Sequence, residues 1–256
     1  MSLDTSTIDS VAELMVRKRP TVALTGAGVS VESGIPDFRS VGGLWDRFDP
    51  AEYATISAFV SSPKKVWSML HELGGTLDAA RPNAGHEALA ELERAGVVAG
   101  VITQNIDNLH QAAGSEAVVE FHGNGRWLIC LDCGLRVDHA TANENLDDDR
   151  IPRCSACSSI LKPDVVLFGE QIPERALTSS YELASMCKVM LVAGTSATVM
   201  PAAAMPLLAR RQGATLVEVN IERTELTPQV DFTLRGRWAE VLPALAEAVL
   251  SKLDRP

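Results

Sequence analysis

The sequence predicts an α/β protein with a doubly wound parallel sheet and a smaller second module. Short, β-rich apolar runs recur along the chain, and runs this apolar are typical of strands that are buried on both faces. The predicted strands are 21–26, 97–105, 118–123, 165–168, 189–194 and 215–220. Segments with helical periodicity separate these runs, and two longer segments interrupt the alternation.

Two of the separating segments have clear helix boundaries. One covers 83–95, with an asparagine at the expected N-cap and Gly96 after its end. The other covers 201–212, with a proline at its start and Gly213 directly after it. Each helix returns the chain to the same edge of the sheet, so consecutive strands are expected to be parallel.

Two stretches break this pattern and divide the chain into modules. Residues 31–80 are too long for one crossover helix, so we expect a helical insertion there. Residues 124–162 hold four paired cysteines and the acidic run NENLDDDR, and we expect them to form a separate module. The remaining segments, 1–30, 81–123 and 163–256, would form the large domain.

Length and charge limit the class of protein. At 256 residues and 46% hydrophobic, the chain can form one sizeable core plus a smaller module. The formal net charge of −10 argues against direct nucleic-acid binding, which needs a basic face, and favours basic partners such as lysine-rich peptides. The N-terminus lacks the pattern of a secretory signal, and no apolar run reaches the length of a membrane span. We therefore expect a cytoplasmic protein without a membrane partner.

Four of the five cysteines form two Cys-x-x-Cys pairs. Cys130 and Cys133 are followed, after twenty intervening residues, by Cys154 and Cys157. This spacing predicts a tetrahedral Zn(II) site, because each pair forms a tight turn and four thiolates fill the coordination shell. Four sulfur ligands leave no position for water, so the zinc is expected to be structural. A redox role for either pair is the alternative, and Cys187 is expected on a buried helix face.

A glycine-rich loop follows the first predicted strand. The segment Gly26-Ala27-Gly28 lets backbone N–H groups approach a phosphate closely, which indicates a nucleotide site. The dinucleotide fingerprint G-x-G-x-x-G would need glycine where the chain has Val31, so a plain tight turn fits equally well.

A rigid turn at 33–36 then leads into Asp37, Phe38 and Arg39. Taken alone, Phe38 fits a core aromatic residue and Arg39 a solvated surface residue. A second glycine-hydroxyl loop, Gly194-Thr195-Ser196, favours a functional role, because it ends another predicted strand. Loops at the carboxyl ends of parallel strands converge on one crevice.

Polar side chains gather at the ends of the second and third predicted strands. Gln104, Asn105 and Asp107 carry amide and carboxylate groups that can bind ribose hydroxyls and a carboxamide. For Asp107 and Asn108 a helix cap is an equally good interpretation. His122 stands at a strand end beside a glycine, where an imidazole suits a general base. A metal ligand and a structural histidine are the alternatives for His122.

Seven sequence blocks together resemble the sirtuin family of NAD-dependent protein lysine deacylases. They occur in the order and spacing of that family, from about Thr21 to Pro243. The blocks are GAGVSVESGIPDFRS, TQNIDNLHQAAG, FHGN, the two Cys-x-x-Cys pairs, KPDVVLFGE, GTSATVMPAA and VEVN. Their agreement in order is more specific than any single motif.

The resemblance implies a Rossmann-like large domain and a small domain made of a zinc ribbon and a helical module. Residues 31–80 would supply the cofactor loop and the helical module, and residues 124–162 the zinc ribbon. NAD, as a cosubstrate, and an acyl-lysine protein or peptide would meet in the cleft between the domains. The products would be free lysine, nicotinamide and O-acetyl-ADP-ribose, and the zinc would take no part in the chemistry.

The resemblance also implies a role for each matching residue. His122 would be the catalytic base, and Asn105 and Asp107 would belong to the same catalytic pocket. The residues implied to bind NAD are Gly26, Ala27, Gly28, Ser30, Asp37, Phe38, Arg39, Gln104, Asn105, Asp107, His122, Gly194, Thr195, Ser196 and Asn220. The residues implied to flank the peptide are Val165, Val166, Phe168, Gly169, Glu170 and Val199. The peptide would pair its backbone with the protein as an added strand.

Two positions depart from the pattern of the family. Sirtuins that prefer succinyl- or malonyl-lysine carry a Tyr-x-x-Arg pair that neutralises the acid, and an ungapped alignment places Leu70 and Leu73 there. An apolar pair cannot stabilise a buried carboxylate, so we expect acetyl or longer apolar acyl groups. Trp238 stands where relatives usually carry a small residue near the adenine. The alternative functions are protein ADP-ribosylation or NAD hydrolysis in the same pocket, and a zinc-ribbon module that recruits partners.

Overall fold

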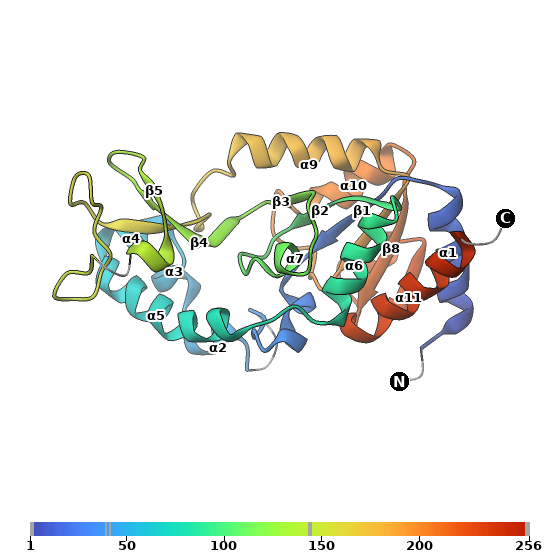
Figure 1. The fold of residues 1–256 in the computed structure, drawn as a ribbon, viewed down its shortest axis with the longest axis horizontal. Coiled ribbons are helices and arrows are strands. Elements are labelled where there is room, and N and C mark those ends of the chain that lie inside the picture. The colour runs from blue at the N-terminus through green and yellow to red at the C-terminus, as the bar shows by residue number, and fades with distance from the viewer. Residues whose placement is uncertain (1–2, 39, 41, 143–144, 254–256) are drawn as a thin grey trace.

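The computed structural model describes residues 3–38, 40, 42–142 and 145–253, and it shows an elongated molecule built from two modules (Figure 1). A six-stranded sheet with its helices forms the large module at one end. A three-stranded sheet and several helices form the small module at the other end. Among the helices of the described residues, none combines the length and the hydrophobicity that crossing a bilayer requires.

The large sheet is parallel throughout. Its strands are β1 (Thr21–Thr25), β2 (Val98–Thr103), β3 (Val118–Glu120), β7 (Val189–Ala193), β8 (Thr215–Asn220) and β9 (Phe232–Arg235). Across the sheet they follow the order β3-β2-β1-β7-β8-β9, which is the doubly wound arrangement of a Rossmann-like fold. The strand order reverses between β1 and β7, and ligands of such sheets bind at this switch point.

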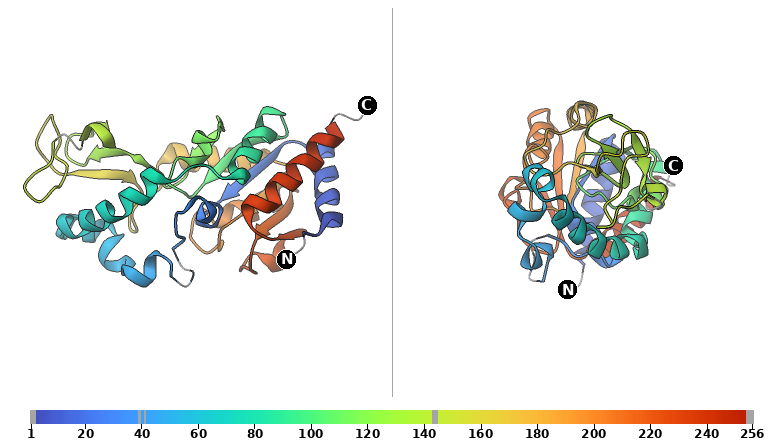
Figure 2. Two further views of the ribbon diagram at one scale, coloured as in Figure 1. Left: turned by 60° about the horizontal axis from the view of Figure 1, so that its bottom comes forward. Right: turned by 90° about the vertical axis from the view of Figure 1, so that its left-hand side faces the viewer.

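Helices cover both faces of the large sheet (Figures 1 and 2). One face carries α1 (Thr5–Arg17), α6 (Ala84–Arg94) and α11 (Trp238–Leu253), and the other carries α9 (Glu174–Met186) and α10 (Ala204–Arg211). Successive side chains of a strand point to opposite faces, so β1 contributes Ala23 to the first core and Val22 and Leu24 to the second. Burial on both faces explains why the strands are continuous apolar runs.

The predicted helix boundaries agree with the structure within a few residues. The side chain of Asn83 accepts the N–H of Gly85 at 3.0 Å and caps α6, as predicted, and His86 completes a capping box. The expected helix at 201–212 is also present, but α10 begins only at Ala204 because the first three residues form a turn.

The prediction of a buried parallel strand at 165–168 is wrong. The strand there is β6 (Leu161–Val165), which belongs to the small sheet and runs antiparallel to β4 (Gly123–Cys130). Beyond Val165 the backbone turns to other partners: the N–H of Val166 donates to His122 at 2.8 Å, and that of Phe168 to Ala54 at 2.8 Å. The apolar run 165–168 therefore lies between the two modules and not in the interior of the large sheet.

The small module combines the helical insertion with the cysteine segment. Its helices are α2 (Leu44–Arg47), α3 (Pro50–Tyr53), α4 (Ile56–Ser61), α5 (Pro63–Ala79) and α8 (His139–Ala142), and its sheet has the order β5-β4-β6, where β5 is Arg136–Asp138. Phe59 and Trp67 from the insertion pack with Leu128 and Leu161 from the sheet in one core. The indole N–H of Trp67 also donates to the carbonyl of Leu161 at 3.1 Å. The two sequence interruptions thus fold as one unit.

Candidate active site

The loops after β1 and β7 pack directly on one another at the switch point of the large sheet. The N–H of Gly26 donates to Ala193 at 3.0 Å, and the N–H of Gly28 donates to Gly194 at 2.8 Å. A Cβ atom on Gly28 would lie 2.8 Å from the Cα of Gly194, and one on Gly194 would lie 2.4 Å from the nitrogen of Val29. The glycines are therefore required for contact between the two loops.

This packing corrects one part of the phosphate argument. The N–H groups of Gly26 and Gly28 both donate to carbonyls of the β7 loop, so they are engaged within the protein. Because Gly26 and Gly28 have no side chains, the backbone of their loop can lie directly against the backbone of the loop after β7. Two short 3₁₀ turns, Ala27–Val29 and Val31–Ser33, begin within the loop and flank Ser30, whose hydroxyl contacts Asn105 and Asp107.

A cluster of amide, hydroxyl and carboxylate groups lies at the ends of β1 and β2. Asn105 donates through Nδ2 to the carbonyl of Gly26 and to Oγ of Ser30, both at 3.1 Å. Ser30 in turn donates to Oδ2 of Asp107 at 2.6 Å. Gln104 donates to Oγ1 of Thr195 at 3.1 Å and so joins the β7 loop to this cluster. The structure thereby brings together candidate residues from three separate segments.

Asp107 has two partners that explain its place in the cluster. Its Oδ1 accepts the N–H of Leu109 at 3.0 Å at the start of α7 (Leu109–Ala112). The N-cap residue of α7 is Asn108, whose side chain makes no capping hydrogen bond, so the cap-like contact comes from Asp107. Burial raises the pKa of this carboxyl, and the hydrogen bond from Ser30 opposes that rise. Asn108 adopts a left-handed conformation, with φ of 63°, and its Oδ1 accepts from Asn124 at 3.0 Å.

His122 stands at the end of β3, half-buried, beside the same cluster. Its Nδ1 lies 3.1 Å from the carbonyl of Gln104, and a carbonyl can only accept, so Nδ1 carries the proton. Nε2 is then the basic nitrogen. Burial lowers the pKa of His122, so the imidazole is neutral at neutral pH and can accept a proton.

The loop after β7, predicted to hold the adenosine half of NAD, is organised around Thr195. The side-chain amide of Asn220, at the end of β8, donates to the carbonyl of Thr195 at 3.1 Å. The hydroxyls of Ser196 and Thr198 lie 2.9 Å apart. Glu218 lies two residues before Asn220 on β8, and its carboxylate is buried. No role for it was predicted from the sequence. It accepts hydrogen bonds from Thr224, Thr227 and Arg235 and fixes the chain that follows Asn220.

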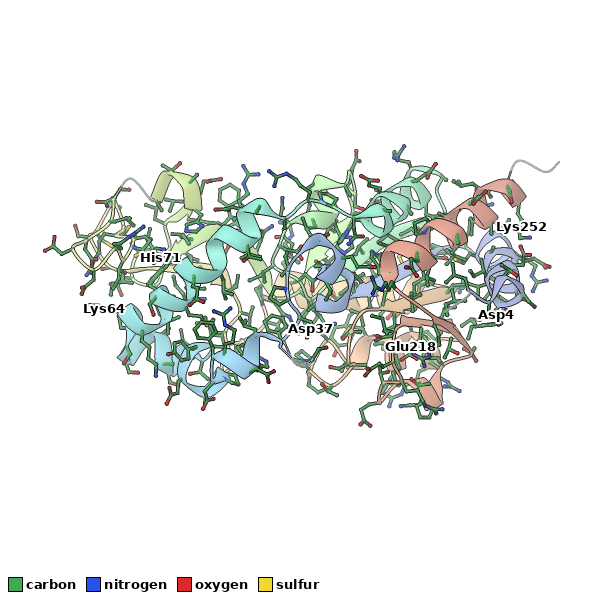
Figure 3. The ribbon with its side chains drawn as sticks, turned by 90° about the horizontal axis from the view of Figure 1, so that it is seen from below. Asp4, Asp37, Lys64, His71, Glu218 and Lys252 are labelled. Carbon is green, nitrogen blue, oxygen red and sulfur yellow. The ribbon has the colours of Figure 1, made fainter. Side chains whose placement is uncertain are left out.

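The segment after the glycine loop runs between the two modules, and Asp37 lies there in Figure 3. The carboxylate of Asp37 accepts the N–H and the hydroxyl of Ser40. Phe38 is 41% exposed and contacts the ring of Trp45 with centroids 5.1 Å apart, so it is not a core residue. Arg39 lies outside the described residues.

The segment predicted to flank a peptide begins at the buried Val165. Phe168 is 45% exposed, and Gly169 has a φ of +89°, which favours glycine. Glu170 faces inward, where its Oε2 accepts from the N–H of Leu167 at 2.8 Å and from Nζ of Lys162 at 2.9 Å. Val199 lies apart from this segment, on the half-buried loop that follows β7.

The four paired cysteines meet at the far end of the small module. Their sulfur atoms lie within 4.8 Å of one another, with 3.5 Å between Cys130 and Cys157 and 3.6 Å between Cys133 and Cys154. A tetrahedron with Zn–S bonds of about 2.3 Å has S···S edges of about 3.8 Å, so this cluster fits a zinc ion. No disulfide joins the described cysteines, and Cys187 is buried elsewhere.

Both Cys-x-x-Cys pairs adopt the same turn. The N–H of Gly134 donates to Cys130 at 2.9 Å, and the N–H of Ser158 donates to Cys154 at 2.8 Å. Both donors have a positive φ, 72° for Gly134 and 63° for Ser158. This repeated knuckle orients the two thiols of each pair toward a shared centre, and four sulfur ligands make the site structural.

The three residues that depart from the family pattern lie wholly or partly within hydrophobic cores. Trp238 is 4% exposed and packs on the N-terminus of α6, where a Cβ on Gly85 would lie 2.2 Å from its Nε1. Leu70 packs against the core of the small module, and Leu73 is half-buried on the same helix. The role of Leu70 and Leu73 in the choice of acyl group and the place of Trp238 near the adenine stay predictions.

A buried histidine pair behind the crevice was not predicted from the sequence. The rings of His86 and His110 lie 4.8 Å apart, and Nε2 of His110 lies 2.9 Å from the hydroxyl of Thr25. Thr25 bonds the hydroxyl of Thr103 at 2.9 Å, and Thr103 accepts the N–H of Asn105 at 3.1 Å. The histidines thus support the strand ends that carry the candidate site.

We expect these two histidines to make the fold sensitive to acid. Burial lowers the pKa of His86 to about 4 and that of His110 to about 3, whereas both titrate near 6.5 in the unfolded chain. Below pH 6.5 the unfolded state therefore binds more protons, and stability falls as the pH decreases toward 4. Two such groups reduce the free energy of unfolding by about 3 kcal/mol per pH unit in that window.

Urea unfolding at several pH values between 7 and 4.5 measures this dependence. The variant His86→Gln removes one of the two groups. The part of the slope of unfolding free energy against pH that comes from these histidines should therefore fall to about half its wild-type value. Equal slopes for the two proteins would contradict the assignment.

The fold and the site define a two-module α/β protein with a Rossmann-like sheet, a neutral histidine beside a polar cluster at the strand ends and a four-cysteine site that fits zinc. The model of the Sir2 family matches residues 26–201, which is more than half of the chain. The chain belongs to this family, the sirtuins.

Curated relatives agree over nearly the whole length. An NAD-dependent protein deacylase 2 of Pyrobaculum aerophilum is 46% identical over 95% of this chain and 96% of its own. An NAD-dependent protein deacetylase 1 of the same organism is 44% identical over 99% of this chain and 100% of its own.

Solved structures share the fold as well. A Sir2 homologue in complex with NAD has a TM-score of 0.90 and 41% identity, with 96% of this chain and 95% of that one covered. A Sir2 protein with a deacetylated p53 peptide and 3′-O-acetyl ADP ribose has a TM-score of 0.87, 35% identity and coverages of 96% and 98%. A Sir2 protein bound to a myristoylated histone peptide has a TM-score of 0.82, 38% identity and coverages of 98% and 99%.

Proposed function

We propose that this chain removes acetyl or longer apolar acyl groups from protein lysines in an NAD-dependent reaction. The observation that carries the proposal is the position of His122, which is neutral, held through Nδ1 by Gln104 and adjacent to the cluster of Asn105 and Asp107. The relatives support it, since they are named NAD-dependent protein deacylases or deacetylases. The products are free lysine, nicotinamide and O-acyl-ADP-ribose.

The candidate residues divide the binding of NAD between the two crevice loops. The loop at 26–28 and Ser30 would face the diphosphate and the nicotinamide ribose, and Thr195 and Asn220 the adenosine half. NAD would supply a ribose carbon whose bond to nicotinamide can break. The acyl oxygen of the substrate would form a bond to that same carbon. Nε2 of His122 then takes the proton of a ribose hydroxyl, and the freed oxygen attacks the acyl carbon. Water completes the transfer to ADP-ribose.

Location and partners follow the same proposal. Thiol cysteines in a zinc site suit a reducing compartment, so we propose the cytoplasm. The net charge of −10 supports basic, lysine-rich proteins as partners and opposes direct contact with nucleic acid. These partners would enter at the exposed segment around Phe168.

We expect acetyl, butyryl and myristoyl groups to be removed and succinyl groups to be retained. An apolar surface at Leu70 and Leu73 offers no cation for a buried carboxylate, which disfavours succinyl-lysine by several kcal/mol, on the order of a hundredfold or more in rate. The measurement is mass spectrometry of one lysine peptide carrying each group, with and without NAD.

The same assay separates the alternatives. Loss of acetyl groups with a matching amount of O-acetyl-ADP-ribose supports the proposal, and removal of succinyl groups alone would contradict the acyl assignment. Consumption of NAD with every peptide intact would indicate NAD hydrolysis or protein ADP-ribosylation. No turnover at all would favour a partner-recruiting zinc module.

A further inference from the structure

A buried ion pair lies beneath the segment predicted to flank the peptide. Lys162 is on β6, and its side chain is 4% exposed, while that of Glu170 is 20% exposed. Nζ of Lys162 donates to Oε2 of Glu170 at 2.9 Å and to the carbonyl of Val165 at 2.6 Å. Lys162 thus bonds to both ends of segment 165–170.

The backbone between these two ends is fixed on three sides. The carboxylate of Glu170 also accepts the N–H of Leu167 at 2.8 Å, which closes a turn over the ion pair. Val166 donates its N–H to the carbonyl of His122 at 2.8 Å. Phe168 donates to Ala54, and its carbonyl accepts from Ile56 at 3.0 Å, in the helical part of the small module. Segment 165–170 therefore connects His122 to the small module.

The register at His122 leaves little freedom for this segment. Gly123, the next residue, pairs with Val165, and a Cβ on Gly123 would lie 2.1 Å from the carbonyl oxygen of Asp164. A shift of the segment must therefore move the backbone of His122 as well. The contacts of the ion pair and those of the histidine form one connected set.

We propose that Lys162 and Glu170 are positioning residues for the acyl-lysine substrate, because they hold segment 165–170 in register with His122. This inference rests on the proposed function. Under it, the ion pair affects turnover of the peptide and not the binding of NAD. A buried pair suits this purpose, since removal of one partner leaves an uncompensated charge that forces the surrounding chain to rearrange. The NAD-binding candidates that follow β1 and β7, and Asn220 on β8, make no hydrogen bond to Lys162 or Glu170 among the described residues.

Steady-state kinetics of Glu170→Gln and Lys162→Met test the proposal. We expect kcat/KM for an acetyl-lysine peptide to fall at least tenfold in each variant, while KM for NAD changes less than twofold. Lys162→Arg keeps a cation near both acceptors and should recover part of the loss. The double variant Lys162→Met with Glu170→Gln leaves no buried charge, but it still lacks the hydrogen bonds from Nζ to Val165 and Glu170. Its kcat/KM for the peptide should therefore stay at least tenfold below that of the wild type.

Lys64→Met is the matched control. Lys64 also forms an ion pair in the small module, with Asp149 at 2.6 Å, but the two side chains are 70% and 49% exposed. Figure 3 places Lys64 at the end of the molecule far from Glu218 and the large module. We expect its kinetics to match the wild type, because exposed pairs contribute little.

Two outcomes would overturn the inference. In one, the variants lose stability in urea unfolding but keep the wild-type kcat/KM for the peptide. In the other, KM for NAD rises as much as kcat/KM for the peptide falls. A wild-type protein without NAD-dependent deacylation would instead refute the proposed function, so the two failures are distinguishable.

Discussion

Replacement of His122 by alanine is expected to abolish deacylation while the protein still binds NAD. General-base catalysis typically contributes a factor of about 10² to 10⁴, and the contact of Nδ1 with Gln104 leaves Nε2 of His122 as the basic nitrogen. His122 is half-buried, and its removal leaves the carbonyl of Gln104 accessible to water, so the fold should survive. The measurement is the rate of O-acetyl-ADP-ribose formation by the variant and by the wild type.

Two further measurements make this result specific to the base. In the proposed sequence of steps the nicotinamide leaves before His122 takes a proton, so exchange of labelled nicotinamide into NAD should persist in the variant when the acetyl peptide is present. His71→Ala is the matched control, since His71 lies in the small module, where its Nε2 contacts the carbonyl of Arg150 (Figure 3). Deacylation by His122→Ala at the wild-type rate would refute the assignment.

Loss of the zinc ion is expected to unfold the small module. Structural zinc in a four-cysteine site contributes about 10 kcal/mol or more of apparent free energy, which equals or exceeds the usual stability of a domain. Cys154 is buried in the same core as Trp67 and Leu128, so its loss also opens that core. We therefore expect Cys154→Ser, or treatment with a strong chelator, to eliminate peptide turnover and the bound metal together.

Elemental analysis checks this prediction, with one zinc ion expected per wild-type chain and none in Cys154→Ser. Cys187→Ser is the control, because Cys187 is also fully buried but lies in the core between the large sheet and α9. It should keep its zinc, although it will lose some stability from the buried hydroxyl. Full activity in a zinc-free protein would contradict a structural role for the cluster.

The sequence predicted those features that local pattern determines. Strands buried on both faces appear as apolar runs, and the cap at Asn83 and the cysteine knuckles have short-range signatures. Strand β9 was missed because it is a four-residue edge strand, and the helix that starts at Trp238 because its apolar face is nearly continuous.

Other parts of the site depend on contacts that no local pattern encodes. The bond from His122 to Gln104 exists because β2 and β3 are neighbours in the sheet. The pairing of His86 with His110 depends on where α6 and α7 meet. The same is true of Lys162, whose burial could not be predicted because it follows from the turn made by Glu170.

The contact between the glycine loops also bears on how the protein is made. Thr21 pairs with Val189, and a Cβ on Gly28 would clash with Gly194, so the candidate site needs two segments that lie far apart in the sequence. On the ribosome the central strand β1 emerges early and must wait, with one edge unpaired, until β7 has been synthesised. Such distant pairing slows folding and leaves an aggregation-prone edge exposed. A nascent chain that ends before β7 already holds all four paired cysteines, but it lacks the loop on which Gly26 and Gly28 pack.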